Sequence, residues 1–280
     1  MVVAWRRWED TGRECRIRPP MSEPDISRVL GIDLGGARMP TTGWVLLEGA
    51  DRPKVTRGER LARTKPERAE RRLLELIEEA APDVVAIDAP LTLPPCLTCP
   101  SFCRGPALDL CELTAARQVW EEGGHPVTER LCEVRLRKEL RTGPLPTMRI
   151  AQIAARGVAL ARRIMAGGTR LGPAGSVRVL EVYPAASLAR LAMVDDRLRP
   201  RDATEGVDAF IARVLDALSE RIDGVGEARE ELRNGHVLDA LIAAYTGWLG
   251  DKGLERPPED FNQAAGWIWL PAVPVSARRL

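Results

Sequence analysis

RVLGIDLGG at Arg28–Gly36 gives the clearest indication of how this chain folds. A short apolar run leads into one acid, Asp33, and two glycines then turn the chain. A second run of the same kind, DVVAID, ends in Asp88 and is followed two residues later by Pro90. Continuous apolar runs of this length are typical of strands buried in a parallel sheet. Both runs are therefore predicted to be strands of one sheet.

The residues between these two runs predict a strand meander and a crossover helix. TGWVLL at Thr42–Leu47 and the segment Lys54–Leu61 are expected to form two further strands, the second of them antiparallel, with glycines at the turns. Pro66–Ala81 places apolar or small side chains at helical spacing among charges, and Pro82 ends that pattern. The order is strand, strand, strand, helix, strand, which is typical of an α/β domain.

Residues 89–146 interrupt this regular pattern. They hold many prolines and glycines and five of the six cysteines. Because compact domains seldom contain an unstructured loop of this length, the segment is predicted to be a functional insertion after the fourth strand. Leu108–Glu121 and Thr128–Leu140 are its expected helices.

Regular elements resume after the insertion. Helices are expected at Thr147–Ala166, Pro184–Leu198, Ala203–Ile222 and His236–Leu249, and strands at Ser176–Val182 and Gly266–Leu270.

The composition restricts the class of protein. The chain has 280 residues, 45% of them hydrophobic, with 41 basic and 40 acidic side chains, so its overall charge does not favour nucleic acid. No apolar run is long enough to span a membrane, so no membrane partner is expected. Residues 1–24 lack the apolar segment of a secretory signal and are expected to be a flexible extension of a domain over residues 25–280. A cytoplasmic location with reduced thiols follows.

Acidic residues are the candidate catalytic and metal-binding groups. Asp33 and Asp88 both end predicted strands, and the carboxyl ends of parallel strands face the crevice where ligands bind. Two carboxylates that lie close together repel each other unless a cation such as Mg²⁺ or Mn²⁺ neutralises them. Asp239 is expected in the first turn of its helix, where a helix-dipole role is the alternative. Glu181, inside a predicted strand, is a further candidate.

The order of these acids resembles that of the RNase H-like superfamily and, more closely, of the predicted nucleases of domain-of-unknown-function family 429. The matching segments are GIDLGG and TGWVLL within residues 31–47, VVAIDAPLTLP at 84–94, EVYPAASLARL at 181–191, HVLDALIAAYTGWL at 236–249 and GWIWLP at 266–271. The resemblance implies an RNase H-like mixed five-stranded sheet flanked by helices, with Asp33, Asp88 and Asp239 at the acidic positions. Tyr183 and Ala185 replace a histidine and a second acid of the family's pattern.

The insertion also contains a cysteine cluster. Its members are Cys96, Cys99, Cys103, Cys111 and, further along, Cys132. Close thiols in a reducing compartment suggest a metal centre more than disulfides, and either Zn²⁺ or an iron–sulfur cluster would suit them. The alternative is a set of buried thiols without a ligand.

Basic and aromatic residues offer weaker signals. Arg135, Arg137 and Arg149 are candidates for binding the phosphates of a nucleic acid or nucleotide, and a solvated helix face is the alternative reading of each. The tryptophans are expected in the core rather than as base-stacking platforms, among them Trp44, Trp120, Trp248, Trp267 and Trp269.

Three functions remain open from the sequence. A metal-dependent nuclease would use Asp33, Asp88, Asp239 and Glu181 as its catalytic set. An actin-like phosphotransferase or ATPase would use the segments Gly35–Gly36 and Thr41–Thr42 near phosphate, although no second GIDLG-like strand is present. A non-enzymatic binding domain held together by metal is the third, and carboxylates spread far apart would favour it.

Overall fold

The structure is a computed structural model, and it describes residues 26–36, 41–61, 66–99, 113–140, 143–166, 177–193, 206–258 and 266–272. The expected N-terminal extension lies outside these residues, as do Cys103 and Cys111 of the cysteine cluster.

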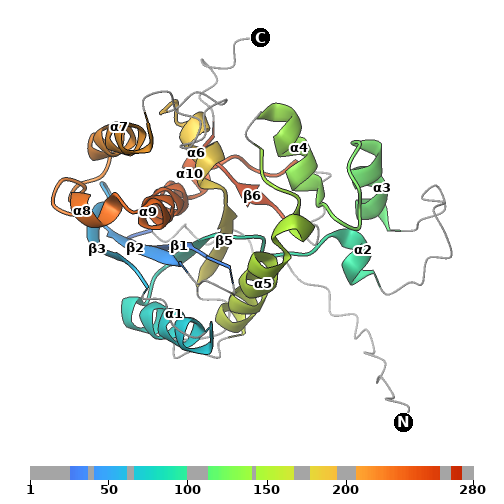
Figure 1. Cartoon of the computed structure of the whole chain (residues 1–280), viewed down its shortest axis with the longest axis horizontal. Helices are drawn as coiled ribbons and strands as arrows, with labels where there is room; N and C mark the ends of the chain where they lie inside the picture. Colours follow the sequence, from blue (N-terminus) through green and yellow to red (C-terminus); the bar gives the residue numbers. More distant parts are fainter. Residues whose placement is uncertain are drawn as a thin grey trace.

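One mixed sheet forms the centre of the structure (Figure 1). Its strands are β1 Arg28–Asp33, β2 Gly43–Glu48, β3 Lys54–Arg60, β4 Val84–Asp88, β5 Arg178–Val182 and β6 Ile268–Trp269. They lie in the order β3-β2-β1-β4-β5-β6. β2 is antiparallel to both β1 and β3, whereas β1, β4, β5 and β6 are mutually parallel. The α/β fold with a mixed sheet is confirmed, but the described sheet has six strands rather than five, because the short β6 pairs with β5.

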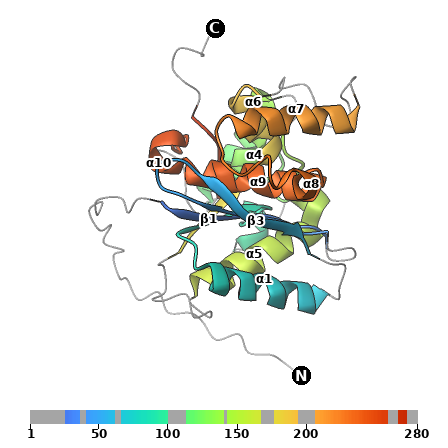
Figure 2. The ribbon, with the colours of Figure 1, turned by 90° about the vertical axis from the view of Figure 1, so that its left-hand side faces the viewer.

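Helices cover both faces of the sheet, as the edge-on view in Figure 2 shows. The helices outside the insertion are α1 Pro66–Ala80, α5 Ala151–Met165, α6 Pro184–Arg190, α7 Val207–Ser219, α8 Arg229–Leu232, α9 Gly235–Trp248 and α10 Gly250–Gly253. α1 and α5 pack against Leu30, Ile32 and Ile87 on one face. α9 packs against Val29, Val45 and neighbouring residues on the other face, with α7 beyond it. Alternating residues of each strand therefore pack into two separate cores, one on each face of the sheet.

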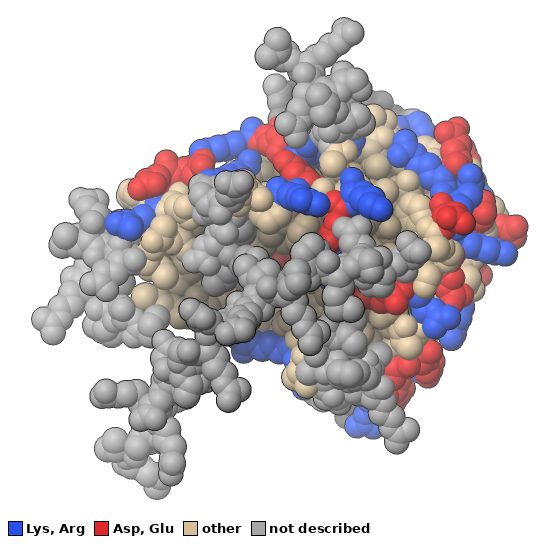
Figure 3. Space-filling view, turned by 180° about the vertical axis from the view of Figure 1, so that it is seen from behind, with Lys and Arg blue, Asp and Glu red and all other residues tan. Residues whose placement is uncertain are grey.

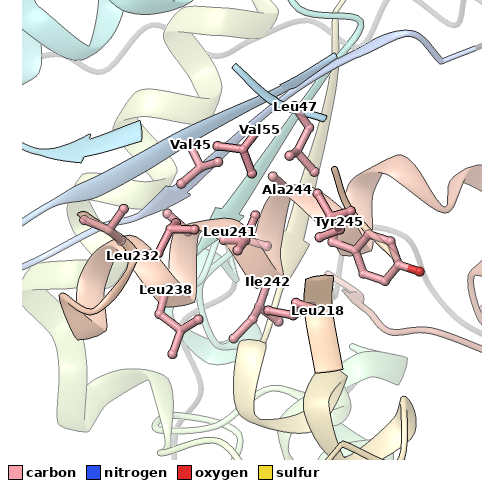
Figure 4. Close-up of a cluster of buried hydrophobic side chains, with 14 of the residues drawn as sticks. Val45, Leu47, Val55, Leu218, Leu232, Leu238, Leu241, Ile242, Ala244 and Tyr245 are labelled. Atoms are coloured by element: carbon pink, nitrogen blue, oxygen red, sulfur yellow. The ribbon is translucent and has the colours of Figure 1, made fainter. Parts of the chain in front are cut away.

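α9 lies very close to the sheet because two strand residues that face it are glycines. A Cβ atom on Gly31 would lie 2.0 Å from the carbonyl oxygen of Ala240, and one on Gly43 would lie 2.2 Å from the carbonyl oxygen of His236. The helix therefore touches strand backbone. Its other apolar side chains, including Leu238 and Leu241, belong to the largest buried cluster (Figure 4).

The segment predicted to be an insertion, residues 89–146, lies with the 3-10 helix that follows it beside the β5–β6 edge of the sheet (Figure 1), and we call this part the insertion lobe. Its described elements are α2 Pro95–Thr98, α3 Thr114–Glu121, α4 Leu131–Glu139 and the following 3-10 helix η2 Thr147–Ile150. Val119 and Leu131 of this lobe share a third buried cluster with Ile268 of β6. α3 and α4 begin later than expected, because Leu113 and Arg130 have extended backbone immediately before them.

Two properties of the surface bear on function. Among the described residues, no helix has both the length and the apolar composition that crossing a bilayer requires. Basic and acidic side chains of the described residues are interspersed on the face drawn in Figure 3. This agrees with the near equality of basic and acidic residues in the sequence.

Candidate active site at the carboxyl ends of β1 and β4

Two aspartates meet at the end of the two central parallel strands. The register pairs the Cα atom of Asp33 in β1 with that of Asp88 in β4. Both alternate with residues that face α9, Gly31 on one strand and Ala86 on the other, so both side chains lie on the α9 face. The expected placement of the two carboxylates on adjacent parallel strands is therefore met.

α9 brings two more titratable groups to this point. Asp239 and His236 lie three residues apart, and residues at that spacing share one helix face. A hydrogen bond joins Nδ1 of His236 to Oδ2 of Asp33 over 2.5 Å. The expected first-turn position of Asp239 is corrected, because the helix begins at Gly235 and Asp239 is its fifth residue. A helix-dipole role, which falls off after the first turn, therefore explains Asp239 poorly.

The charges of this group influence one another. Burial raises the pKa of the Asp88 carboxyl well above its ordinary value, and the negative charges of Asp33, Asp239 and Glu181 raise it further. Burial, together with the charge of Asp33, raises the pKa of Asp239 to about 7, although His236 opposes this shift. Burial also raises the pKa of Asp33, against the effect of His236. The hydrogen bond to Asp33 is the main cause of a raised His236 pKa.

The donor set fits a hard divalent cation only in part. Carboxylate oxygens are the ligands that Mg²⁺ and Mn²⁺ prefer. Among the described residues, however, no three His, Cys, Asp or Glu side chains are arranged to hold a metal ion together. Mg²⁺ usually binds through one or two carboxylates, with water and substrate phosphate completing its shell. Asp33 and Asp88 suit that mode of binding, because a cation between them would offset the burial of both carboxylates and the charge of Asp33 that raises the pKa of Asp88.

Glu181 lies near this group but on the other side of the sheet. It pairs in register with Ile87, the residue before Asp88. Its neighbours Leu180 and Val182 belong to the core on the α9 face, so Glu181 points to the α5 face. There both carboxylate oxygens accept from the guanidinium of Arg130, at 2.6 and 2.7 Å, and Oε2 also accepts from the backbone N–H of Leu91 at 2.8 Å. Its carboxylate is therefore occupied within the protein.

Arg130 is the centre of a buried polar cluster, and its side chain is only 1% exposed. Besides Glu181, its guanidinium donates to Glu133 at 2.9 Å and to the hydroxyl groups of Thr92 and Thr147. Glu133 also accepts from the backbone N–H of Thr147. We call Arg130, Glu133, Thr147 and Glu181 the Arg130 cluster. It fastens α4 and η2 of the insertion to the end of β5.

The turn after Asp33 is fixed from two directions. The backbone N–H of Gly35 donates to the hydroxyl of Thr42, which is fully buried, over 3.3 Å. The carbonyl of Gly35 accepts from the guanidinium of Arg156, and the same guanidinium pairs with Glu70 at 2.7 Å. Because the buried Thr42 hydroxyl accepts a hydrogen bond from the backbone of Gly35, the structure gives no support to a phosphate-binding role for it in a phosphotransferase.

The predicted phosphate-binding arginines differ in their surroundings. Arg135 pairs with Glu122 at 3.2 Å, and Arg137 pairs with Glu129. Arg149, in η2, is exposed and forms no ion pair among the described residues. Of the three, only Arg149 therefore presents a charge that no described acid neutralises.

The described cysteines are not assembled into a metal centre. Cys96 and Cys99 lie in or beside α2 and are partly buried. Cys132 packs among the apolar residues of the insertion core, and burial raises its pKa to about 12, which disfavours the thiolate that a metal needs. Cys103 and Cys111 lie outside the described residues, so the metal role of the cluster stays a prediction.

Sequence reasoning missed His236 and Arg130. His236 could have been found from its spacing, because a residue three positions before Asp239 must share its helix face. No local pattern identifies Arg130, since its partner Glu181 is 51 positions away and several other arginines surround it in the sequence.

Comparison with known proteins gives the family. The model described as "Protein of unknown function (DUF429)" matches residues 31–262, and the chain belongs to this family. No curated protein matches the chain. Among solved structures, it is similar to T. thermophilus RuvC in complex with Holliday junction substrate, at 18% sequence identity and a TM-score of 0.37, over 78% of this chain and 90% of that chain. The family description assigns no activity, so a function has to be argued from the site.

Proposed function

We propose that the chain is a metal-dependent nuclease that hydrolyses phosphodiester bonds at the carboxyl ends of β1 and β4. The observation that carries this proposal is the register of Asp33 against Asp88, with Asp239 close enough to raise the pKa of Asp88. Carboxylates gathered this way are costly for a protein to maintain without a bound cation. A site for Mg²⁺ or Mn²⁺ accounts for that cost.

Each residue has a distinct part in the proposed site. Asp33 and Asp88 would hold the cation, and Asp239 would complete the anionic wall from α9. When bound, the cation would lower the pKa of a water molecule and stabilise charge on the phosphate. His236 fixes one oxygen of Asp33 through its hydrogen bond, which leaves the other oxygen available. Glu181 serves as a positioning residue through Leu91 and Arg130, and so differs from the direct catalytic role first expected of it.

The proposal is tested by hydrolysis of labelled DNA and RNA in the presence of Mg²⁺ or Mn²⁺. Asp33→Asn and Asp88→Asn are each expected to lower the rate at least a hundredfold, because a neutral amide binds a divalent cation poorly. Asp208→Asn is the matched control, since it makes the same change at an exposed position in the first turn of α7. Hydrolysis that survives in both site variants, or needs no divalent cation, would contradict the proposal.

A second metal centre at the cysteines is proposed separately, with a cytoplasmic location that keeps the thiols reduced. Cys96 and Cys99 would supply two ligands to Zn²⁺ or an iron–sulfur cluster, with the other ligands from Cys103 and Cys111. We expect about one zinc, or a coloured iron centre, per chain by elemental analysis and absorption spectroscopy. Cys96→Ser is expected to lose this metal and Cys132→Ser to keep it. Purified protein that is metal-free and fully stable would contradict the idea.

A further inference from the structure

Exposed apolar side chains gather on the insertion lobe. Of the seven large apolar side chains that are exposed among the described residues, five fall between positions 97 and 148. They are Leu97, Trp120, Val127, Leu145 and Met148, with exposed fractions from 40 to 51%. The expectation that Trp120 lies in the core was wrong, because half of its side chain is exposed. Exposed apolar side chains that gather in one region, unlike scattered single ones, are typical of an interaction site.

Backbone hydrogen bonds bring several of these residues together although they lie far apart in the sequence. The N–H of Cys96 donates to the carbonyl of Pro126 over 3.1 Å, and each of these residues directly precedes an exposed member of the group, Leu97 or Val127. The backbone of α2 therefore lies against the loop after α3.

The same loop reaches two more members of the group. The N–H of Met148 donates to the carbonyl of Thr128 over 3.2 Å, which joins η2 to the loop. The ring of Trp120 meets that of His125 edge-on, with 6.5 Å between their centroids. We call Leu97, Trp120, His125, Val127 and Met148 the insertion stripe.

The Arg130 cluster connects the segment that carries the insertion stripe to β5, beside the strand that ends in Asp88. Thr128 lies two residues before Arg130, whose guanidinium binds Glu181. Glu181 in turn pairs in register with Ile87, the residue before Asp88. Because the Arg130 cluster is buried, this path is a fixed connection rather than a flexible one. The lobe that carries the stripe is therefore anchored at β5, the strand next to β4 and Asp88.

The charges around the insertion stripe favour an anionic partner. Glu122 is paired with Arg135 and Lys138, and Glu129 is paired with Arg137. Exposed Glu121 is the only acid of α3. Two exposed cations, Arg117 and Arg149, form no ion pair among the described residues. The net charge that is left over on these elements is therefore positive.

We propose that the insertion stripe binds the unpaired bases of a nucleic-acid strand. The ring of Trp120 stacks on a base, and Arg117 and Arg149 contact the phosphates on either side of it. This inference rests on the proposed nuclease function and narrows its substrate to nucleic acid with a single-stranded part. A protein partner would match the apolar groups equally well, and the two arginines that no described acid neutralises favour the anionic strand.

Binding to labelled single strands tests this inference, with fluorescence anisotropy as the readout. The full chain is titrated in EDTA, so that no hydrolysis interferes, against a DNA strand of about 20 nucleotides and an abasic strand with the same backbone. Trp120→Ala is expected to weaken binding of the base-containing strand roughly tenfold, because it removes the ring on which a base stacks. Trp120→Phe is expected to retain most of the affinity, and the abasic strand should bind every variant equally weakly.

Met165→Ala is the matched control, because Met165 is also 51% exposed but lies at the end of α5, outside the stripe. The inference is overturned if Trp120→Ala leaves the affinity unchanged, if both strands lose affinity equally, or if the variant changes only self-association measured by light scattering. Failure of the nuclease proposal would look different. In that case Trp120 would still govern strand binding, while the wild-type chain would hydrolyse no nucleic acid with Mg²⁺ or Mn²⁺.

Discussion

The protonation of Asp239 links the stability of the protein to pH. Burial of its carboxyl, together with the charge of Asp33, raises its pKa from 3.8 to about 7. A raised pKa means that the folded protein binds this proton more tightly than the unfolded chain does. The resulting stabilisation is complete below pH 4 and is lost as the pH rises to 7 and beyond.

This difference predicts a pH-dependent effect of Asp239→Asn. In metal-free protein the variant is expected to match the wild type in melting temperature near pH 4 and to exceed it by several degrees at pH 8, where the wild-type carboxylate is charged. Thermal unfolding across this pH range measures the effect, and exposed Asp208→Asn is the control. Addition of Mg²⁺ at pH 8 should stabilise the wild type more than the variant. A constant difference at all pH values would argue against a charged cluster.

The sequence predicts the positions of some of these acidic side chains but not of all. Asp33 and Asp88 were predictable, because each ends an apolar strand and a crossover helix makes the two strands parallel. The face of the sheet to which Glu181 points was not predictable. Alternation along a strand shows which residues share a face, but it does not show which of the two faces carries the acidic site. Its partner Arg130 comes from the insertion, whose packing on the sheet no periodicity in the sequence describes.

Among the elements, the Arg130 cluster attaches α4 and η2 to the end of β5. One guanidinium satisfies two buried carboxylates, so removal of Arg130 would leave Glu133 and Glu181 charged and without that partner. Most regular elements could be foreseen from their patterns, including the short strand at β6. The attachment of the lobe could not, because it depends on side chains from three separate segments.

Arg130→Met is therefore expected to destabilise the chain by about 3–5 kcal/mol, the usual cost of breaking a buried ion pair. Chemical denaturation measures the free energy of unfolding. Arg52→Met is the control, because its pair with Asp223 is about half exposed on both sides and should contribute less than about 1 kcal/mol. If both variants lose equally little stability, the Arg130 cluster does not hold the insertion to the sheet. Addition of Glu133→Gln and Glu181→Gln to Arg130→Met should recover part of the loss.

At the scale of the whole molecule, charge is nearly balanced, at 41 basic and 40 acidic residues. Most described cations of the insertion are already paired with acids, as Arg135, Arg137 and Lys138 are. On the described part of the insertion, a nucleic-acid ligand would therefore meet few free cations. Affinity would depend more on base contacts than on release of counterions.

This balance predicts that binding of a single strand depends weakly on salt. The logarithm of the association constant should fall against the logarithm of salt concentration with a slope of magnitude about 1–2, because each phosphate contact contributes about 0.7. Arg149→Ala is expected to reduce the slope by about 0.7, whereas Arg135→Ala, whose side chain is paired with Glu122, should change it little. A steep slope in the wild type would indicate an extended basic surface that the described residues do not contain.

The close contact of α9 with Gly31 and Gly43 affects how this protein would unfold on heating. The helix that carries Asp239 and His236 is also the centre of the largest buried cluster, so it cannot detach while the rest stays folded. An enzyme with its site on a surface loop can lose activity long before it melts. In the proposed nuclease, loss of the carboxylate site on heating is therefore expected to coincide with global unfolding.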